Sequence, residues 1–144
     1  MRAGPGFLPK CDALETLQVG SSQRCQFRRG SGLRHIAHLS SLRDLNLCNS
    51  GITDSDFEPL EALAGLRRLN ISGTRITDKT LKRLSAFTKL EDLSIYDTDI
   101  TADGVLSLAN VPSLRHVNMP DSIPAKARSA LRKALPQADI FPEP

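Results

Sequence analysis

The chain has 144 residues, of which 40% are hydrophobic and 24% charged, and its formal net charge at pH 7 is +3. These values suit one soluble domain, and because 16 acidic residues are interleaved with 19 basic ones, the charge does not favour a nucleic-acid partner. No stretch approaches the roughly 18 to 20 apolar residues that cross a bilayer, and residues 1–10 lack the apolar run of a secretory signal. Three cysteines cannot all pair within the chain, which favours a reducing compartment, so we expect a cytoplasmic location and no membrane partner.

The first part of the chain is irregular. Residues 1–10 hold two glycines and two prolines and are expected to form a loose tail, followed by a first repeat at 14–41. This repeat is four residues longer than the ones after it, and the extra residues belong to an exposed basic loop predicted at 21–31. Its apolar positions are Leu14, Leu17, Val19, Leu33, Ile36 and Leu39.

Three successive segments then superimpose without gaps at a period of 24 residues: 42–65, 66–89 and 90–113. Each reads Leu-x-x-Leu-x-(Leu/Ile)-x-x-(Ser/Thr)-x-Ile-Thr and then carries three apolar residues spaced by three. Self-similarity at such a period indicates a solenoid, in which each repeat packs only on its neighbours. The apolar trios are Phe57, Leu60, Leu63; Leu81, Leu84, Phe87; and Val105, Leu108, Val111.

Each regular repeat is expected to form a short strand followed by a helix. In the segment 42–65, Leu45 and Leu47 alternate with Asp44, Asn46 and Cys48, so one face of the strand is apolar. A hydroxyl at the ninth position can bond the turning backbone, and the threonine after the isoleucine is predicted to cap a helix of about ten residues. The trio then lies on one helical stripe that packs against the strand. The hydroxyls are Ser50, Thr74 and Thr98, and the predicted caps are Thr53, Thr77 and Thr101.

The chain ends in a modified repeat. A fifth repeat is predicted at 114–134, a closing half-repeat at 135–141 and a short tail at 142–144. In the fifth repeat Pro124 stands where the earlier repeats carry the capping threonine, and the residues after it have the spacing of an amphipathic helix.

The repeats resemble those of the leucine-rich repeat family, and the resemblance covers residues 11–141. It implies an α/β solenoid of about five repeats, with parallel strands on the concave side and helices on the convex side. The family usually carries Asn or Cys where this chain has a hydroxyl. The Thr-Asp helix starts look closest to bacterial repeat proteins and to the repeats of ubiquitin-ligase substrate receptors. The resemblance further implies a surface that binds another protein, without catalysis.

Candidate partner-binding residues lie on the outer, concave face of the predicted sheet. Parallel strands stack about 4.8 Å apart, so equivalent positions of successive repeats form ladders on this face. Tyrosine and arginine are enriched among interface anchors, which singles out Tyr96, the only tyrosine, and Arg68. For the charged and amide positions, a polar face that pairs with itself is an equally simple interpretation. The candidates are Asp44, Asn46, Arg68, Asn70, Ser72, Asp92, Ser94, Tyr96, His116 and Asn118.

The cysteines and histidines do not form a recognisable metal or catalytic site. Cys11, Cys25, His35 and His38 are ligand types for zinc, but the repeat register places both histidines beside or away from the apolar stripe of a helix. Cys48 has no base among its predicted ladder neighbours, and no phosphate-binding or acyl-transfer motif occurs. We therefore expect no catalytic residue, metal, cofactor or small-molecule substrate.

Two functional interpretations stay open. The favoured one is a non-catalytic interaction module that binds a protein partner on its concave face. The alternative is a structural fragment or subunit, such as the C-terminal part of a longer leucine-rich repeat protein, for example a substrate receptor or effector. The strand around Leu14 would then be an open sheet edge, which favours self-association.

Overall fold

The computed structural model of the chain describes residues 16–18 and 40–141. The predicted tails at 1–10 and 142–144 and the basic loop at 21–31 lie outside the described residues, as does most of the first repeat. The four zinc-type ligands Cys11, Cys25, His35 and His38 lie outside them too.

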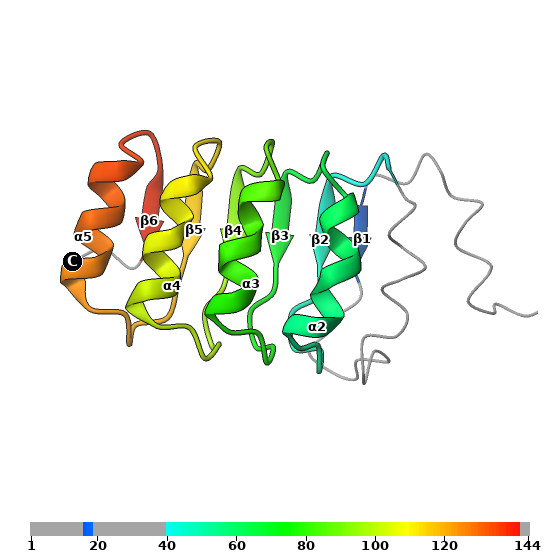
Figure 1. Cartoon of the computed structure of the whole chain (residues 1–144), viewed down its shortest axis with the longest axis horizontal. Helices are drawn as coiled ribbons and strands as arrows, with labels where there is room; N and C mark the ends of the chain where they lie inside the picture. The colour runs from blue at the N-terminus through cyan, green and yellow to red at the C-terminus, as the bar shows by residue number, and fades with distance from the viewer. Residues whose placement is uncertain (1–15, 19–39, 142–144) are drawn as a thin grey trace, which may run out of the picture.

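Six parallel strands form one sheet and follow one another in chain order (Figure 1). They are β1 (Thr16–Gln18), β2 (Asp44–Asn46), β3 (Arg68–Asn70), β4 (Asp92–Ser94), β5 (His116–Asn118) and β6 (Asp139–Phe141). Leu45 pairs with Leu69, and Leu69 with Leu93, so the repeats stack at the register that the 24-residue period predicts. A slip of one residue would turn the leucines to the other face, which is why the pattern predicts the register well.

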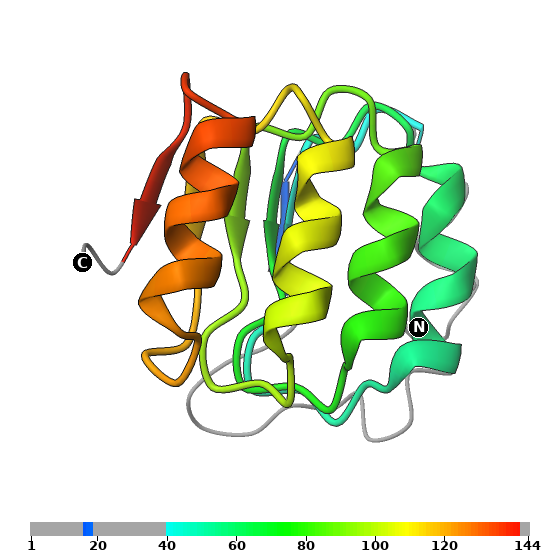
Figure 2. The same cartoon turned by 60° about the vertical axis from the view of Figure 1, so that its left-hand side comes forward.

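A layer of helices covers one face of the sheet (Figures 1 and 2). The α-helices are α2 (Asp54–Phe57), α3 (Asp78–Arg83), α4 (Ala102–Leu106) and α5 (Ala125–Ala134), and 3-10 helices η2 (Glu58–Ala62), η3 (Leu84–Ala86) and η4 (Ser107–Asn110) continue the first three. The expected α/β solenoid, with a parallel sheet on one side and helices on the other, is confirmed. None of the helices in the described part of the chain is long and apolar enough to cross a membrane.

The helices of the regular repeats differ from the uniform ten-residue helices expected from the sequence. Each begins as one or two α-helical turns and ends as a 3-10 helix. The apolar trio explains the change, because a spacing of three is the period of a 3-10 helix, and Phe57, Leu60 and Leu63 can then all face the sheet. In α5 the buried Ala127 and Leu131 are spaced by four, and the helix stays α-helical throughout.

The hydrophobic core runs between the two layers. Leu45, Leu69 and Leu93 from the strands are at most 2% exposed and belong to the same buried cluster as the trios. The rings of Phe57 and Phe87, from successive repeats, meet edge to face with centroids 6.0 Å apart. Because each repeat buries its apolar face against both neighbours, the middle repeats are packed on two sides.

Every regular repeat turns sharply where its strand ends. The ninth-position hydroxyl donates to the carbonyl oxygen three residues earlier, as predicted, and the residue before it lies in the left-handed region that Asn, Gly and Asp tolerate best. The hydroxyl bonds join Ser50 to Leu47, Thr74 to Ile71 and Thr98 to Ile95. The left-handed residues are Asn49, Gly73 and Asp97, with φ of 59°, 69° and 60°.

The predicted helix caps serve a second purpose across repeats. Thr53, Thr77 and Thr101 are N-caps as expected. However, the N–H and hydroxyl of Thr77 donate to the Asp54 carboxylate of the preceding repeat, at 2.8 and 2.6 Å. The same groups of Thr101 donate to Asp78. We call this arrangement the inter-repeat cap. The aspartate carboxylate is charged and is therefore a stronger hydrogen-bond acceptor than a neutral oxygen, which favours these bonds between repeats.

The inter-repeat cap does not continue from the fourth repeat to the fifth, because the sequence lacks the residues that form it. The fifth repeat has Pro124 in place of the threonine and so offers neither an N–H nor a hydroxyl at this point. In the fourth repeat, Ala102 stands where the two earlier repeats have aspartate. The chain therefore loses the acceptor and the donor together.

Candidate binding surface on the strand face

A ladder of charged side chains crosses the face of the sheet opposite the helices, which we call the strand face. Arg68 Nε lies 3.2 Å from an oxygen of Asp92, and its Nη1 lies 3.7 Å from Asp44. His116 lies between Asp92 and Asp139, with its ring nitrogens 3.9 and 3.5 Å from their carboxylates. The predicted charged ladder is thus brought together, and β6 extends it. Since the Arg68 side chain is 68% exposed, these pairs contribute little to stability, about 0 to 1 kcal/mol each.

The predicted amide positions form a second ladder, which is half-buried. The side-chain oxygens of Asn46 and Asn70 accept the N–H groups of the residues two positions on, at 3.0 and 3.1 Å. The Asn118 amide donates to the Ser94 hydroxyl at 3.4 Å. These side chains thus take part in shaping the end of each strand.

Ser72 is the candidate that the structure removes from this surface. Its side chain is 3% exposed, and its Oγ has no hydrogen-bond partner among the described residues. The alternation that predicts an outward direction ends with β3 at Asn70, and the chain then turns through the left-handed Gly73. Tyr96, at the equivalent position one repeat later, is 51% exposed.

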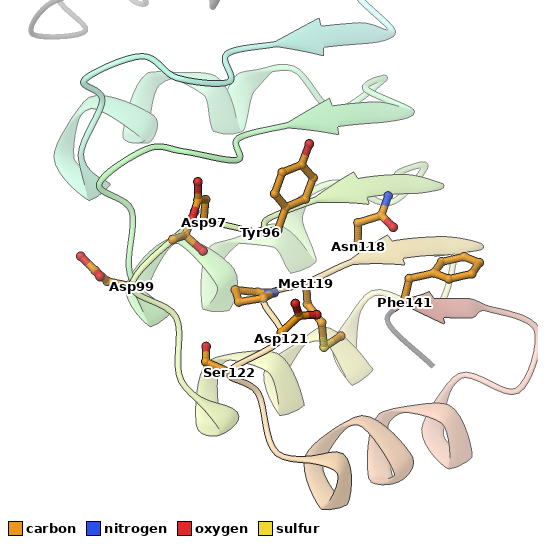
Figure 3. A pocket seen from close by; sticks show the side chains of 10 residues that line it. Tyr96, Asp97, Asp99, Asn118, Met119, Asp121, Ser122 and Phe141 are labelled. Atoms are coloured by element: carbon orange, nitrogen blue, oxygen red, sulfur yellow. The ribbon is translucent and has the colours of Figure 1, made fainter. Parts of the chain in front are cut away.

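Beside Tyr96 the surface is hollowed into a pocket of about 740 Å³. In Figure 3 the side chains of Tyr96, Asn118 and Phe141 follow one another along the ends of β4, β5 and β6. Asp97, Asp99 and Asp121 line the pocket from the loops that follow β4 and β5. The pocket therefore combines aromatic and acidic side chains, and Phe141 is 42% exposed.

Phe141 and the three aspartates are not among the site residues that the sequence predicts. Phe141 pairs in register with Asn118. Its place in the amide ladder can therefore be predicted from the sequence if the strand of the closing half-repeat is aligned with the strand of the fifth repeat. The aspartates lie in loops after the strands, where the period-2 alternation carries no information. In the described part of the chain, no group of three or more His, Cys, Asp or Glu side chains could hold a metal ion.

Searches by sequence return nothing: no model of a known protein family matches the chain, and no curated protein does. Solved structures do match. Internalin C2 from Listeria monocytogenes superimposes with a TM-score of 0.59 at 27% identity, over 75% of this chain. The aligned region is 44% of the internalin, so the chain spans less than half of that protein.

Two further structures share the architecture. A Leptospira interrogans LRR protein matches 90% of this chain and 37% of its own, with a TM-score of 0.56 at 20% identity. The C-terminal domain of tropomodulin from Caenorhabditis elegans matches 92% of this chain and 89% of its own, with a TM-score of 0.69 at 17% identity. At these identities the likeness concerns the fold. The chain has the leucine-rich repeat fold that its 24-residue pattern predicts.

Proposed function

We propose that the chain is a non-catalytic protein-binding module that holds its partner on the strand face. The observation that carries this proposal is the exposure of two residues. Tyr96 is 51% exposed as a whole residue, and the side chain of Arg68 is 68% exposed. Both are residue types that dominate binding energy in protein interfaces. Leucine-rich repeat proteins are in general interaction domains, which supports the same function.

The strand face is a better candidate than the helix layer because its exposed arginine is held more closely: Arg83 on α3 also lies between two carboxylates, Glu58 and Glu61, but at 4.0 and 3.9 Å. Arg68 is held between two carboxylates, so less side-chain freedom is lost when a partner contacts it. Half-buried amides beside it offer hydrogen bonds from fixed positions. A preorganised polar face with one exposed tyrosine is suited to specific recognition of a protein surface.

The test compares two faces of the same molecule. Partners are captured with the full chain and identified by mass spectrometry, and each affinity is then measured by calorimetry. We expect Tyr96→Ala and Arg68→Ala each to weaken binding by about 2 kcal/mol or more. Lys82→Ala and Arg83→Ala, on α3, should change it by less than about 0.5 kcal/mol. Loss of binding in the helix variants alone, with folding intact by circular dichroism, would place the interface on the helix layer.

A second candidate function is that of a structural unit in a longer repeat protein or assembly. The observation that favours it is the coverage: the chain matches 44% and 37% of two longer repeat proteins. A genomic reading frame that continues upstream with further 24-residue repeats would support this alternative, and a stop codon directly upstream would count against it. The cytoplasmic location stays a prediction.

A further inference from the structure

We propose that the pocket beside Tyr96 binds an arginine side chain of the partner protein. This inference rests on the proposed function, because it names the chemistry of the partner at one end of the same surface. It concerns the pocket lined by Tyr96, Asp97, Asp99, Asn118, Asp121 and Phe141.

The size of the pocket fits part of a peptide. Its volume of about 740 Å³ lies within the range of roughly 300 to 1,000 Å³ typical of ligand sites. The buried Met119 and Pro120 contribute to its lining. Such a hollow holds one long side chain together with the adjoining backbone.

The charge of the pocket is opposite to that of the whole chain. Asp97, Asp99 and Asp121 are all exposed, and none of the described residues that line the pocket is a lysine, arginine or histidine. The chain as a whole carries +3, so the local negative charge does not follow from its overall composition. Three carboxylates around a hollow attract a cation and repel an anionic ligand.

The aromatic rings favour a guanidinium over an ammonium group as the cation that binds in the pocket. Tyr96 and Phe141 keep 51% and 42% of their surface in solvent, although large apolar rings are otherwise buried in this core. A guanidinium is planar, stacks on aromatic faces and is weakly hydrated, and its N–H fork matches a carboxylate. The ammonium group of lysine is not planar and has no fork of N–H donors, so it would interact less well with the aromatic rings and carboxylates of the pocket.

The other repeats provide an internal comparison. The same turn, with its left-handed residue, follows β2 and β3. After β3 the residues equivalent to Tyr96, Asp97 and Asp99 are Ser72, Gly73 and Arg75, and after β2 they are Cys48, Asn49 and Gly51. The turn therefore forms without an aromatic ring and without acids, and their presence beside β4 is not required by the fold.

The probe for this inference is N-acetyl-arginine methylamide, titrated into the ¹⁵N-labelled full chain at low salt. We expect amide shifts at Tyr96–Asp99, Asn118, Met119, Asp121, Ser122 and Phe141; Pro120 has no N–H and gives no signal. The matched neutral probe, N-acetyl-citrulline methylamide, has nearly the same shape without the charge and should bind at least about fivefold more weakly. Raising the salt to about 0.5 M should weaken the arginine probe further.

Matched variants locate the site. Asp97→Asn combined with Asp121→Asn should weaken arginine binding by at least about fivefold, because two of three carboxylates are neutralised. Asparagine tolerates the backbone at residue 97, as Asn49 does at the equivalent position. Asp103→Asn, the same change at an exposed position on α4, should leave binding unchanged.

Two results would overturn the inference: equal shifts from the citrulline and arginine probes, or arginine shifts confined to the charged ladder. Its failure is separable from that of the proposed function. If Arg68→Ala weakens a captured partner while the Asp97/Asp121 pair does not, the strand face stands and the arginine pocket fails. If the arginine probe binds the pocket while no strand-face variant, Tyr96→Ala included, weakens any partner, the pocket has affinity for a guanidinium, but the proposed interface and the assignment of that arginine to a partner protein both fail.

Discussion

Asp54 is the residue that shows best how one repeat stabilises the next. Its carboxylate accepts the N–H and hydroxyl of Thr77, and the hydroxyl of the buried Thr80 at 2.6 Å. Partial burial by itself raises the pKa of Asp54, but the hydrogen bonds from Thr77 and Thr80 outweigh it and hold the pKa below the usual 3.8. The ionised form is thus favoured by folding.

This lowered pKa predicts a loss of stability in acid. Asp54 stabilises the fold at pH values above its unfolded pKa, and the contribution disappears as the pH falls through the lower, folded pKa. We expect Asp54→Asn to lower the free energy of unfolding by about 1 kcal/mol at neutral pH, a low value because the carboxylate is partly exposed. The difference in this free energy between the variant and the unmodified chain should shrink below about pH 4.

Urea unfolding at several pH values between 7 and 3 measures this effect. Asp103→Asn is the control, since Asp103 is exposed in the first turn of α4. A constant difference between Asp54→Asn and the unmodified chain at all pH values would contradict the assigned role of the charge.

Residue roles were predictable from the sequence only when they act locally. The hydroxyls of Thr74 and Thr98 bond the backbone three residues away, and the pattern predicted this. Asp54 was read as part of a helix start, yet its partners lie 23 and 26 residues later. Propensity rules describe neighbours along the chain, so they do not reveal a bond that exists only after the repeats have stacked.

At the scale of the element, the spacing of the trio decides the form of the helix. A spacing of three favours a 3-10 helix, which explains why η2, η3 and η4 follow the short α-helices. The sequence contained this information, but the threonine cap and the length of the segment predicted a continuous α-helix. Spacing proved more informative than capping for the second half of each helix.

The packing of the strands leads to a prediction about the middle and the end of the solenoid. Leu69 on β3 has a repeat on either side, so Leu69→Ala should lower the free energy of unfolding by about 2 to 5 kcal/mol. Leu131→Ala on α5, in the last full repeat, should cost less because the packing there continues on one side only. Both residues are at most 2% exposed, which makes them a matched pair. A larger loss for Leu131→Ala in urea unfolding would show that stability is concentrated at the C-terminal end.

The candidate site was predictable along the strands and not beyond them. Arg68, Asp92 and His116 stand in one ladder because the 24-residue period fixes their register. The pocket arises where the chain leaves β4 and β5, and its shape depends on three-dimensional turns that periodicity does not encode. Ser72 is buried for the same reason: it follows the end of β3, where the alternation of the strand no longer predicts the direction of a side chain.

At the scale of the whole molecule, the sheet has two ends. Among the described strands, β1 and β6 each pair with one neighbour. An unpaired strand edge offers N–H and carbonyl groups to another chain, and pairing of β6 with the β1 of a second copy is a head-to-tail contact that does not close.

We therefore expect self-association that grows with concentration, measured by light scattering from low to high micromolar protein. A charge on an edge strand opposes such pairing, so Phe141→Lys on β6 should shift the association to higher concentration. Leu106→Lys on α4 is the control, since both side chains are about equally exposed, at 42% and 40%. A monomer at every concentration would contradict the pairing of β6 with β1 of a second copy.

The fixed period also makes the length of this protein adjustable, but only in whole units. Removing residues 66–89 would join Gly65 to Leu90 and bring Asp54 beside Thr101, so the strand register and the inter-repeat cap would close again one unit shorter. The charged ladder would change, because the loss of Arg68 would place Asp44 beside Asp92. Removing a single residue would instead turn a strand over and expose its leucines. Gain or loss of one such unit moves the far end of the strand face by about 4.8 Å and keeps the way in which the remaining repeats stack. The reach of the molecule along a partner can thus change in evolution without redesign of its core.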